Sequence, residues 1–115
     1  MNTLETLISA IDMRTSISFE YNKEGKVKGE RIGNTYAIYI LTAKNTGVKS
    51  TKVDIVQTDG VSDTKDTKPF PDFRMFNIED LSNVKLFGVK ESYAPPFDSK
   101  YKPESERYKD VIAKV

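Results

Sequence analysis

The stretch Phe73-Arg-Met-Phe-Asn-Ile-Glu-Asp-Leu-Ser-Asn-Val-Lys-Leu-Phe87 decides the fold class that we predict for this chain. Phe76 and Ile78 alternate with polar residues, which is typical of a strand with one buried face. Glu79-Asp80-Leu81 interrupts the alternation, and a second strand then continues to Leu86. Two short strands around an acidic corner indicate a small β-barrel in which this stretch forms the closing edge.

The amino-acid composition excludes several kinds of functional site. The chain has 115 residues, the length of one domain, and its 37% hydrophobic content is enough for one core. The 18 basic and 17 acidic residues give a formal charge of +1, without the basic excess usual in nucleic-acid binders. The absence of Cys and His excludes disulfides, thiolate zinc sites and imidazole bases. No apolar run could cross a membrane and no signal peptide is seen, so we expect a cytoplasmic protein without a membrane partner.

An amphipathic helix is predicted over Asn2 to Asp12. The apolar residues that recur at helical spacing are Leu4, Leu7, Ile8 and Ile11. Asn2 and Glu5 have the spacing of a capping box. Because so short a helix is marginal alone, we expect its apolar face to pack on the core.

Four strands are expected between this helix and the closing stretch. They are Thr15 to Asn22, Val27 to Ile32, Tyr36 to Thr42 and Lys52 to Thr58. The connections between them are a hairpin turn at Asn22 to Gly25, a bend at Gly33-Asn34 and a turn at Asn45 to Gly47. The almost continuously apolar strand from Tyr36 to Thr42 fits the centre of a sheet.

Two polar segments complete the chain. Asp59 to Asp72 is a long hairpin loop, and loops of this length are usually functional or mobile. Gly88 to Val115 combines prolines with aromatic residues, and Lys109 to Val115 is predicted to be a short strand or a helical turn. The aromatic residues suggest a tail that lies on the barrel. We therefore divide the chain into a barrel with its helix, residues 1–88, and an extended C-terminal tail, residues 89–115, packed on the barrel.

Three segments, residues 10–21, 74–81 and 101–112, resemble parts of the WYL domain, a small SH3- or Sm-like barrel. Residues 10–21 (AIDMRTSISFEY) match its helix that ends in a basic residue and leads into an apolar strand. Residues 74–81 (RMFNIEDL) are similar to its closing pattern, Arg-x-Phe-x-Leu-Asp-Arg-Ile. The tail from Tyr101 to Ile112 is similar to that of short WYL-like proteins of tailed bacteriophages.

The resemblance implies a barrel that senses a ligand or binds nucleic acid, often in bacterial transcription or phage defence. Arg14, Arg31 and Arg74 stand where the family tends to place basic residues. Two other basic positions are occupied here by Asn77 and Asp80, and each lost phosphate contact lowers affinity for nucleic acid. The segment TKVDI, residues 51–55, stands where the Trp-Tyr-Leu triplet would fall.

Basic residues gather around two predicted turns. They are Lys23, Lys26, Lys28 and Arg31 at the first, and Lys44, Lys49 and Lys52 at the second. With Tyr21, Tyr36 and Tyr39 they could line a groove in which bases stack on the rings. In the alternative interpretation the lysines only protect exposed strand edges from pairing.

Acidic residues offer two weaker hypotheses. A calcium site could be built from Asp59, Asp63, Asp66 and Asp72, although their spacing is not that of an EF-hand. A solvated loop explains them better. Asp54 and Glu20 could form a carboxylate pair for acid–base chemistry, but nothing in the sequence orients them. The aromatic, proline-containing tail could dock a partner or pack within the chain, and both alternatives stay open.

We therefore predict a mainly β protein (α+β) that is non-enzymatic, needs no cofactor or metal, and is encoded by a phage or a bacterium. Single-stranded nucleic acid or a nucleotide is the expected ligand, and the predicted ligand-binding residues are Arg14, Tyr21, Arg31, Tyr39 and Arg74. The alternative is a protein-interaction module or inhibitor that acts on a bacterial defence or regulatory system, with a protein partner or as a homo-oligomer.

Overall fold

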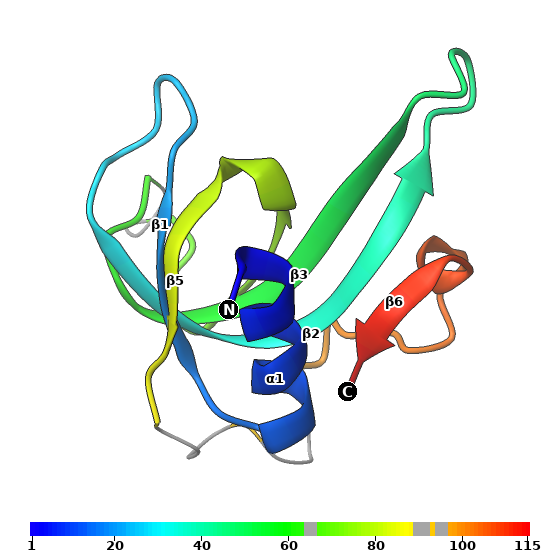
Figure 1. Ribbon diagram of the computed structural model, residues 1–115. Coiled ribbons are helices and arrows are strands. Elements are labelled where there is room, and N and C mark those ends of the chain that lie inside the picture. Colours follow the sequence, from blue (N-terminus) through cyan, green and yellow to red (C-terminus); the bar gives the residue numbers. More distant parts are fainter. Residues whose placement is uncertain (64–66, 89–92, 94–96) are drawn as a thin grey trace.

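A computed structural model describes residues 1–63, 67–88, 93 and 97–115 (Figure 1). The elements in chain order are α1 (Thr3–Met13), β1 (Ile17–Tyr21), β2 (Glu30–Thr42), β3 (Lys49–Gly60), β4 (Asp72–Asn77), the 3-10 turn η1 (Ile78–Asp80), β5 (Leu81–Leu86), the 3-10 turn η2 (Glu106–Tyr108) and β6 (Val111–Lys114). The mainly β class with one N-terminal helix is confirmed. No helix in the described part of the chain is long and apolar enough to span a membrane.

The strands form one antiparallel sheet with the order β4-β3-β2-β1-β5, and β6 pairs with β2 outside this path. β4 and β5 are the two ends of this order, so hydrogen bonds do not close the sheet on itself. The predicted closed barrel is therefore wrong. The stretch from Phe73 to Phe87 does supply two strands around a one-turn break, as predicted, but they lie at opposite edges of an open sheet.

β2 is the centre of this sheet because it pairs with a neighbouring strand along its whole length. One edge pairs with β3 throughout, while the other edge pairs first with β1, through Glu30 to Gly33, and then with β6, through Ala37 to Tyr39. The register with β3 shifts after Ile32 and again after Thr35. Such irregularities bend a strand and increase its twist, which lets one edge serve two different partners.

The predicted bend at Gly33-Asn34 is thus an irregularity inside one continuous strand. A Cβ atom at Gly33 would lie 2.7 Å from both the Ile55 side chain and the Val56 carbonyl oxygen, so only glycine fits this close approach to β3. Asn34 is buried beside it, and its side-chain oxygen accepts a hydrogen bond of 2.6 Å from the Ser16 hydroxyl. A buried polar residue with a partner explains why the sequence resembles a turn here.

The sheet is covered on both faces. On one face α1 packs on a core that contains Leu7, Ala10, Ile11, Ile17, Phe19, Ile38, Val53, Ile55, Phe76 and Leu81. The opposite face carries a second core of Tyr36, Ala37, Tyr39, Val56, Tyr93, Tyr101 and Tyr108. Burial on both faces explains the continuous apolar run in β2. The helix begins with the predicted capping box between Asn2 and Glu5.

The C-terminal segment, described at residues 93 and 97–115, contributes three tyrosines to the second core. Tyr93, Tyr101 and Tyr108 are almost fully buried, and the Tyr101 hydroxyl donates a 2.7 Å hydrogen bond to the Val115 carbonyl. β6 adds a strand to β2, as Figure 1 shows beside the second half of that strand. Intramolecular packing therefore accounts for these aromatic side chains, while Pro95-Pro96 lie outside the described residues.

The close approach at Gly33 can be tested by adding one methyl group. We expect Gly33→Ala to destabilise the protein by about 1–3 kcal/mol, because the methyl group meets backbone and side-chain atoms of β3. Thr42→Ala, at the exposed end of the same strand, is the control and should change little. Urea denaturation measures both, and equal stabilities for the two variants would contradict this role of Gly33.

Candidate functional site

A surface pocket of about 310 Å³ opens beside β4, and we call it the Tyr21–Arg74 pocket. The residues that line it are Tyr21, Lys26, Asp63, Lys68, Asp72, Phe73, Arg74, Met75 and Phe76. They come from β1, β4 and the two loops that precede β2 and β4. The pocket thus combines aromatic and basic side chains with two carboxylates.

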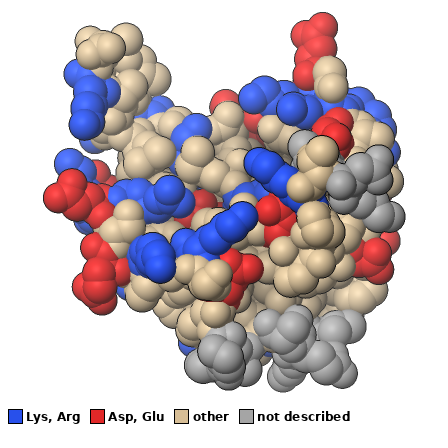
Figure 2. Space-filling model, turned by 180° about the vertical axis from the view of Figure 1, so that it is seen from behind, with Lys and Arg blue, Asp and Glu red and all other residues tan. Residues whose placement is uncertain are grey.

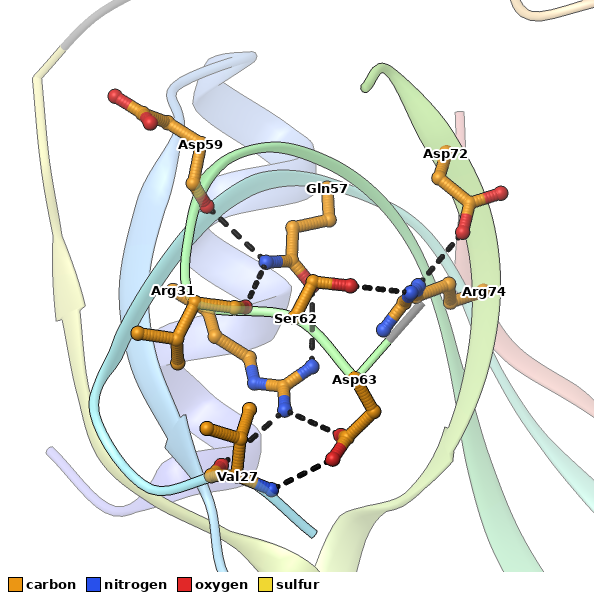
Figure 3. A network of polar contacts seen from close by, with 9 residues as sticks. Val27, Arg31, Gln57, Asp59, Ser62, Asp63, Asp72 and Arg74 are labelled. Carbon is orange, nitrogen blue, oxygen red and sulfur yellow. Dashed lines mark hydrogen bonds and ion pairs between the residues drawn. The ribbon is translucent and has the colours of Figure 1, made fainter. Parts of the chain in front are cut away.

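Arg31 is completely buried and contacts Tyr21 and Asp63, two residues of the pocket lining; Figure 3 shows its guanidinium beside Val27 and Asp63. Its guanidinium donates hydrogen bonds to the Gln57 side chain at 3.3 Å and to the Val27 carbonyl at 3.4 Å, and it forms an ion pair with Asp63 at 3.2 Å. It also lies over the Tyr21 ring, 5.2 Å from the centroid. Arg31 was predicted to bind a ligand; the structure buries it, and there it contacts the Tyr21 ring and the two loops.

Asp63 connects the two loops. One carboxylate oxygen pairs with Arg31, and the other accepts a 2.8 Å hydrogen bond from the Val27 N–H. Partial burial opposes the charge, but the Val27 N–H and Arg31 outweigh it, so the pKa of Asp63 is lowered. Gln57 extends the network by donating to the carbonyl oxygens of Asp59 and Val61. The two loops of the pocket wall are therefore joined through one buried cation, Arg31.

Arg74 is positioned in a similar way on β4. Its Nε donates to Asp72 at 2.7 Å, and a terminal nitrogen donates to the Ser62 hydroxyl at 2.7 Å. Figure 3 shows Arg74 and Arg31 on either side of the loop that contains Ser62 and Asp63. The carboxylates that line the pocket are thus both engaged by arginines.

The other two predicted ligand-binding residues lie elsewhere. Arg14 is the C-cap of α1, in a left-handed conformation, and its guanidinium lies 5.1 Å from the centroid of the Phe97 ring. Tyr39 is fully buried in the second core. The structure therefore brings together Tyr21, Arg31 and Arg74 but not Arg14 or Tyr39.

A second polar site groups Asp54 with Tyr39, Tyr108 and Arg107. The sequence suggested separate roles for Asp54 and Tyr39, and this grouping was missed. Asp54 is completely buried, and it accepts hydrogen bonds from the hydroxyls of Tyr39 at 2.8 Å and Tyr108 at 2.7 Å. Arg107 lies 3.5 Å from the same carboxylate. The available signal was an acidic residue between Val53 and Ile55, in a strand with two buried faces. The Asp54 carboxylate therefore links η2, through Tyr108, to the sheet.

The suggested pair of Asp54 and Glu20 does not form. Strand β2 separates β3, which carries Asp54, from β1, which carries Glu20. Glu20 instead accepts a hydrogen bond from the Asn83 side chain. The geometry offers no shared proton between the two carboxylates.

The predicted basic groove is only partly assembled. Lys26 lines the Tyr21–Arg74 pocket, whereas Lys52 donates a hydrogen bond to Asn77. On the face drawn in Figure 2, basic side chains are interleaved with acidic ones. Lys68, which was not among the predicted site residues, adds a further cation to the pocket.

The aspartates of the long loop have partners other than a metal. Asp63 and Asp72 pair with Arg31 and Arg74, and Asp59 accepts a hydrogen bond from the Gly60 N–H. Asp66 lies outside the described residues. Within the described ranges, no three carboxylate, imidazole or thiol side chains are gathered as a metal site would require.

Comparisons with protein-family models, with curated proteins and with solved structures found no match to this chain.

The buried ion pair gives a first test of this site. Asp63→Asn leaves the fully buried Arg31 without its countercharge, and we expect a loss of about 3 kcal/mol in the free energy of unfolding at neutral pH. Because the pKa of Asp63 is lowered, this contribution is present above the usual Asp pKa and disappears as the pH falls through the lowered value. Asp12→Asn, an exposed site on α1, is the control for denaturation experiments. Equal losses in the two variants would contradict the role of Asp63.

The tyrosines of the second core give a pH-dependent test. Burial raises the pKa of Tyr36, Tyr39, Tyr93, Tyr101 and Tyr108 above the usual value of 10.0, and Asp54 adds to this effect at Tyr39 and Tyr108. Above pH 10 the unfolded chain releases these protons while the folded chain retains them. Stability should therefore fall as the pH rises, by about 1.4 kcal/mol per pH unit for each such tyrosine.

Chemical denaturation from neutral pH to about pH 11 measures this slope. Tyr108→Phe should reduce the slope by about one proton, since one titrating group is removed. Tyrosinate absorbance that develops fully near pH 10, while the circular dichroism remains that of the folded protein, would contradict this account.

Proposed function

We propose that this protein is a non-enzymatic binding protein, and that its ligand is a nucleotide or a short segment of single-stranded nucleic acid held in the Tyr21–Arg74 pocket. One observation carries the proposal. The pocket joins the ring of Tyr21, from β1, to the cations Lys26, Lys68 and Arg74, from three other segments. Its volume lies within the range of small-molecule sites.

The charges of the pocket favour an anionic ligand. Together with the buried Arg31, four cations surround two carboxylates. Asp63 and Asp72 already engage Arg31 and Arg74, so Lys26 and Lys68 bring a net positive charge to the rim. Phosphate oxygens are suitable acceptors for these ammonium groups.

The aromatic side chains favour a base beside that phosphate. Tyr21 is half-buried and is held by the Phe76 ring, 4.9 Å away between centroids, and by Arg31. A ring fixed in this way loses little entropy when a base packs on it, and such stacking contributes about 1–3 kcal/mol per base. The resemblance of residues 10–21 and 74–81 to WYL domains supports ligand sensing.

A protein-interaction module is the second candidate, because both ends of the sheet are edge strands. β4 carries Met75 at 50% exposure, and β5 ends at Leu86, which is 38% exposed and is followed by Phe87 at 45%. Unpaired strand edges are templates for pairing with another chain, including a second copy or a component of a defence system. Strand-edge pairing without any nucleotide affinity would favour this candidate.

The leading proposal predicts binding that depends on both the ring and the charges. Titration with labelled oligonucleotides and with a panel of nucleotides should show saturable binding that weakens steeply with salt. Tyr21→Leu and Lys68→Gln should each weaken binding at least about fivefold, through lost stacking and a lost phosphate contact.

Matched controls separate this pocket from the rest of the surface. Lys44→Gln removes the same charge at the β2–β3 turn, outside the pocket lining, and should leave the affinity unchanged. No binding at low salt, or an equal loss in Lys44→Gln and Lys68→Gln, would overturn the proposal.

A further inference from the structure

A second recess lies beside η2, on the segment that covers the second core. It has a volume of about 60 Å³, and Lys100, Lys102, Ser105, Arg107 and Tyr108 line it. We call it the Arg107 recess. It shares no residue with the Tyr21–Arg74 pocket.

Arg107 is fixed in this recess from below. One terminal nitrogen lies 3.5 Å from the buried Asp54 carboxylate, and the guanidinium lies 6.0 Å from the centroid of the Tyr108 ring. The side chain is nevertheless 44% exposed. A planar guanidinium that is held on one side retains donors on the other, and such a fork suits two oxygens of one anion.

The lining contains no carboxylate, which distinguishes this recess from the Tyr21–Arg74 pocket. Within the described ranges, neither Lys100 nor Lys102 has an acidic partner at ion-pair distance, and Glu104 and Glu106 do not line the recess. Asp54 lies behind Arg107, where two tyrosine hydroxyls also satisfy it. Three cations and the Ser105 hydroxyl therefore face a space with one shielded negative charge behind it.

We propose that the Arg107 recess binds a phosphate group, either as inorganic phosphate or as the phosphate of a small phosphomonoester. The volume holds a single tetrahedral anion but not a nucleoside. Arg107 supplies paired N–H donors, Lys100 and Lys102 supply positive charge, and Ser105 supplies a hydroxyl donor. The three cations less the charge of Asp54 leave two positive charges, which match a dianionic phosphate, whereas a carboxylate carries half of that charge.

The test is an NMR titration of the whole chain with inorganic phosphate, with glycerol phosphate and with sodium chloride at matched ionic strength. Phosphate and glycerol phosphate should shift the Ser105 amide and the Arg107 side-chain signals in a saturable manner. Tighter binding of glycerol phosphate would identify an ester as the better ligand, and equal binding would show that the phosphate group alone is recognised.

Three variants test whether the phosphate-induced shifts come from binding in the Arg107 recess. Arg107→Gln should weaken phosphate binding at least about tenfold. The Lys102 side chain is exposed and makes no ion pair with a described residue, so Lys102→Gln should weaken binding without affecting folding. Lys109→Gln removes the same charge outside the recess and should leave binding unchanged. Identical shifts with chloride, or unchanged phosphate binding in both Arg107→Gln and Lys102→Gln, would overturn the proposal.

Discussion

The central strand β2 has to pair with three other strands, and this constraint organises the molecule. β3 occupies one edge, while β1 and β6 share the other. The change of partner falls between Gly33 and Ala37, where the register with β3 also shifts. Because Gly33 allows β3 to approach, the strand bends without losing its ladder. The first half of β2 supports the Tyr21–Arg74 pocket through Arg31, and the second half pairs with β6 of the C-terminal segment.

Each half is secured by one buried charge. Arg31 holds the loops before β2 and β4 through Val27 and Asp63, and Asp54 holds η2 through Tyr108. Both charges have several hydrogen-bonding partners, as a charge removed from water requires. In both cases the partner comes from a segment distant in sequence, so each charge fixes a surface recess as well as the chain beneath it. Each proposed ligand site is thus supported by one buried charged side chain. This side chain is a cation, Arg31, in the first site and an anion, Asp54, in the second.

Local patterns predicted much of the secondary structure but little of the long-range arrangement. The helical spacing and the capping box located α1, and the period of two around Phe76 located β4 and the turn to β5. The closed barrel was wrong because alternation identifies strands but does not specify which edges pair. At Gly33, turn-forming residues suggested a bend, whereas the glycine provides room for a neighbouring strand.

The residues of the candidate site were also only partly predictable, because local patterns do not show which distant residues meet. Tyr21 and Arg74 lie on strands whose alternation could be read, and both reach the pocket. Arg31 looked like an exposed residue near charged neighbours, yet its partner Asp63 lies 32 residues away in sequence and becomes visible only in the fold. Asp54 and Tyr108 illustrate the point again, since 54 residues separate them. A hydrogen bond or ion pair between a buried charge and a distant segment leaves no local pattern in the sequence.

The proposed ligand site is the pocket that Arg31 supports. Intermolecular NOE measurements on the labelled protein with a bound nucleotide would locate the ligand. We expect contacts between base protons and the Tyr21 ring, with accompanying contacts from the ribose to side chains of Lys68 or Arg74. Base contacts confined to the exposed edges of β4 and β5, or no intermolecular contact at saturating nucleotide, would contradict it.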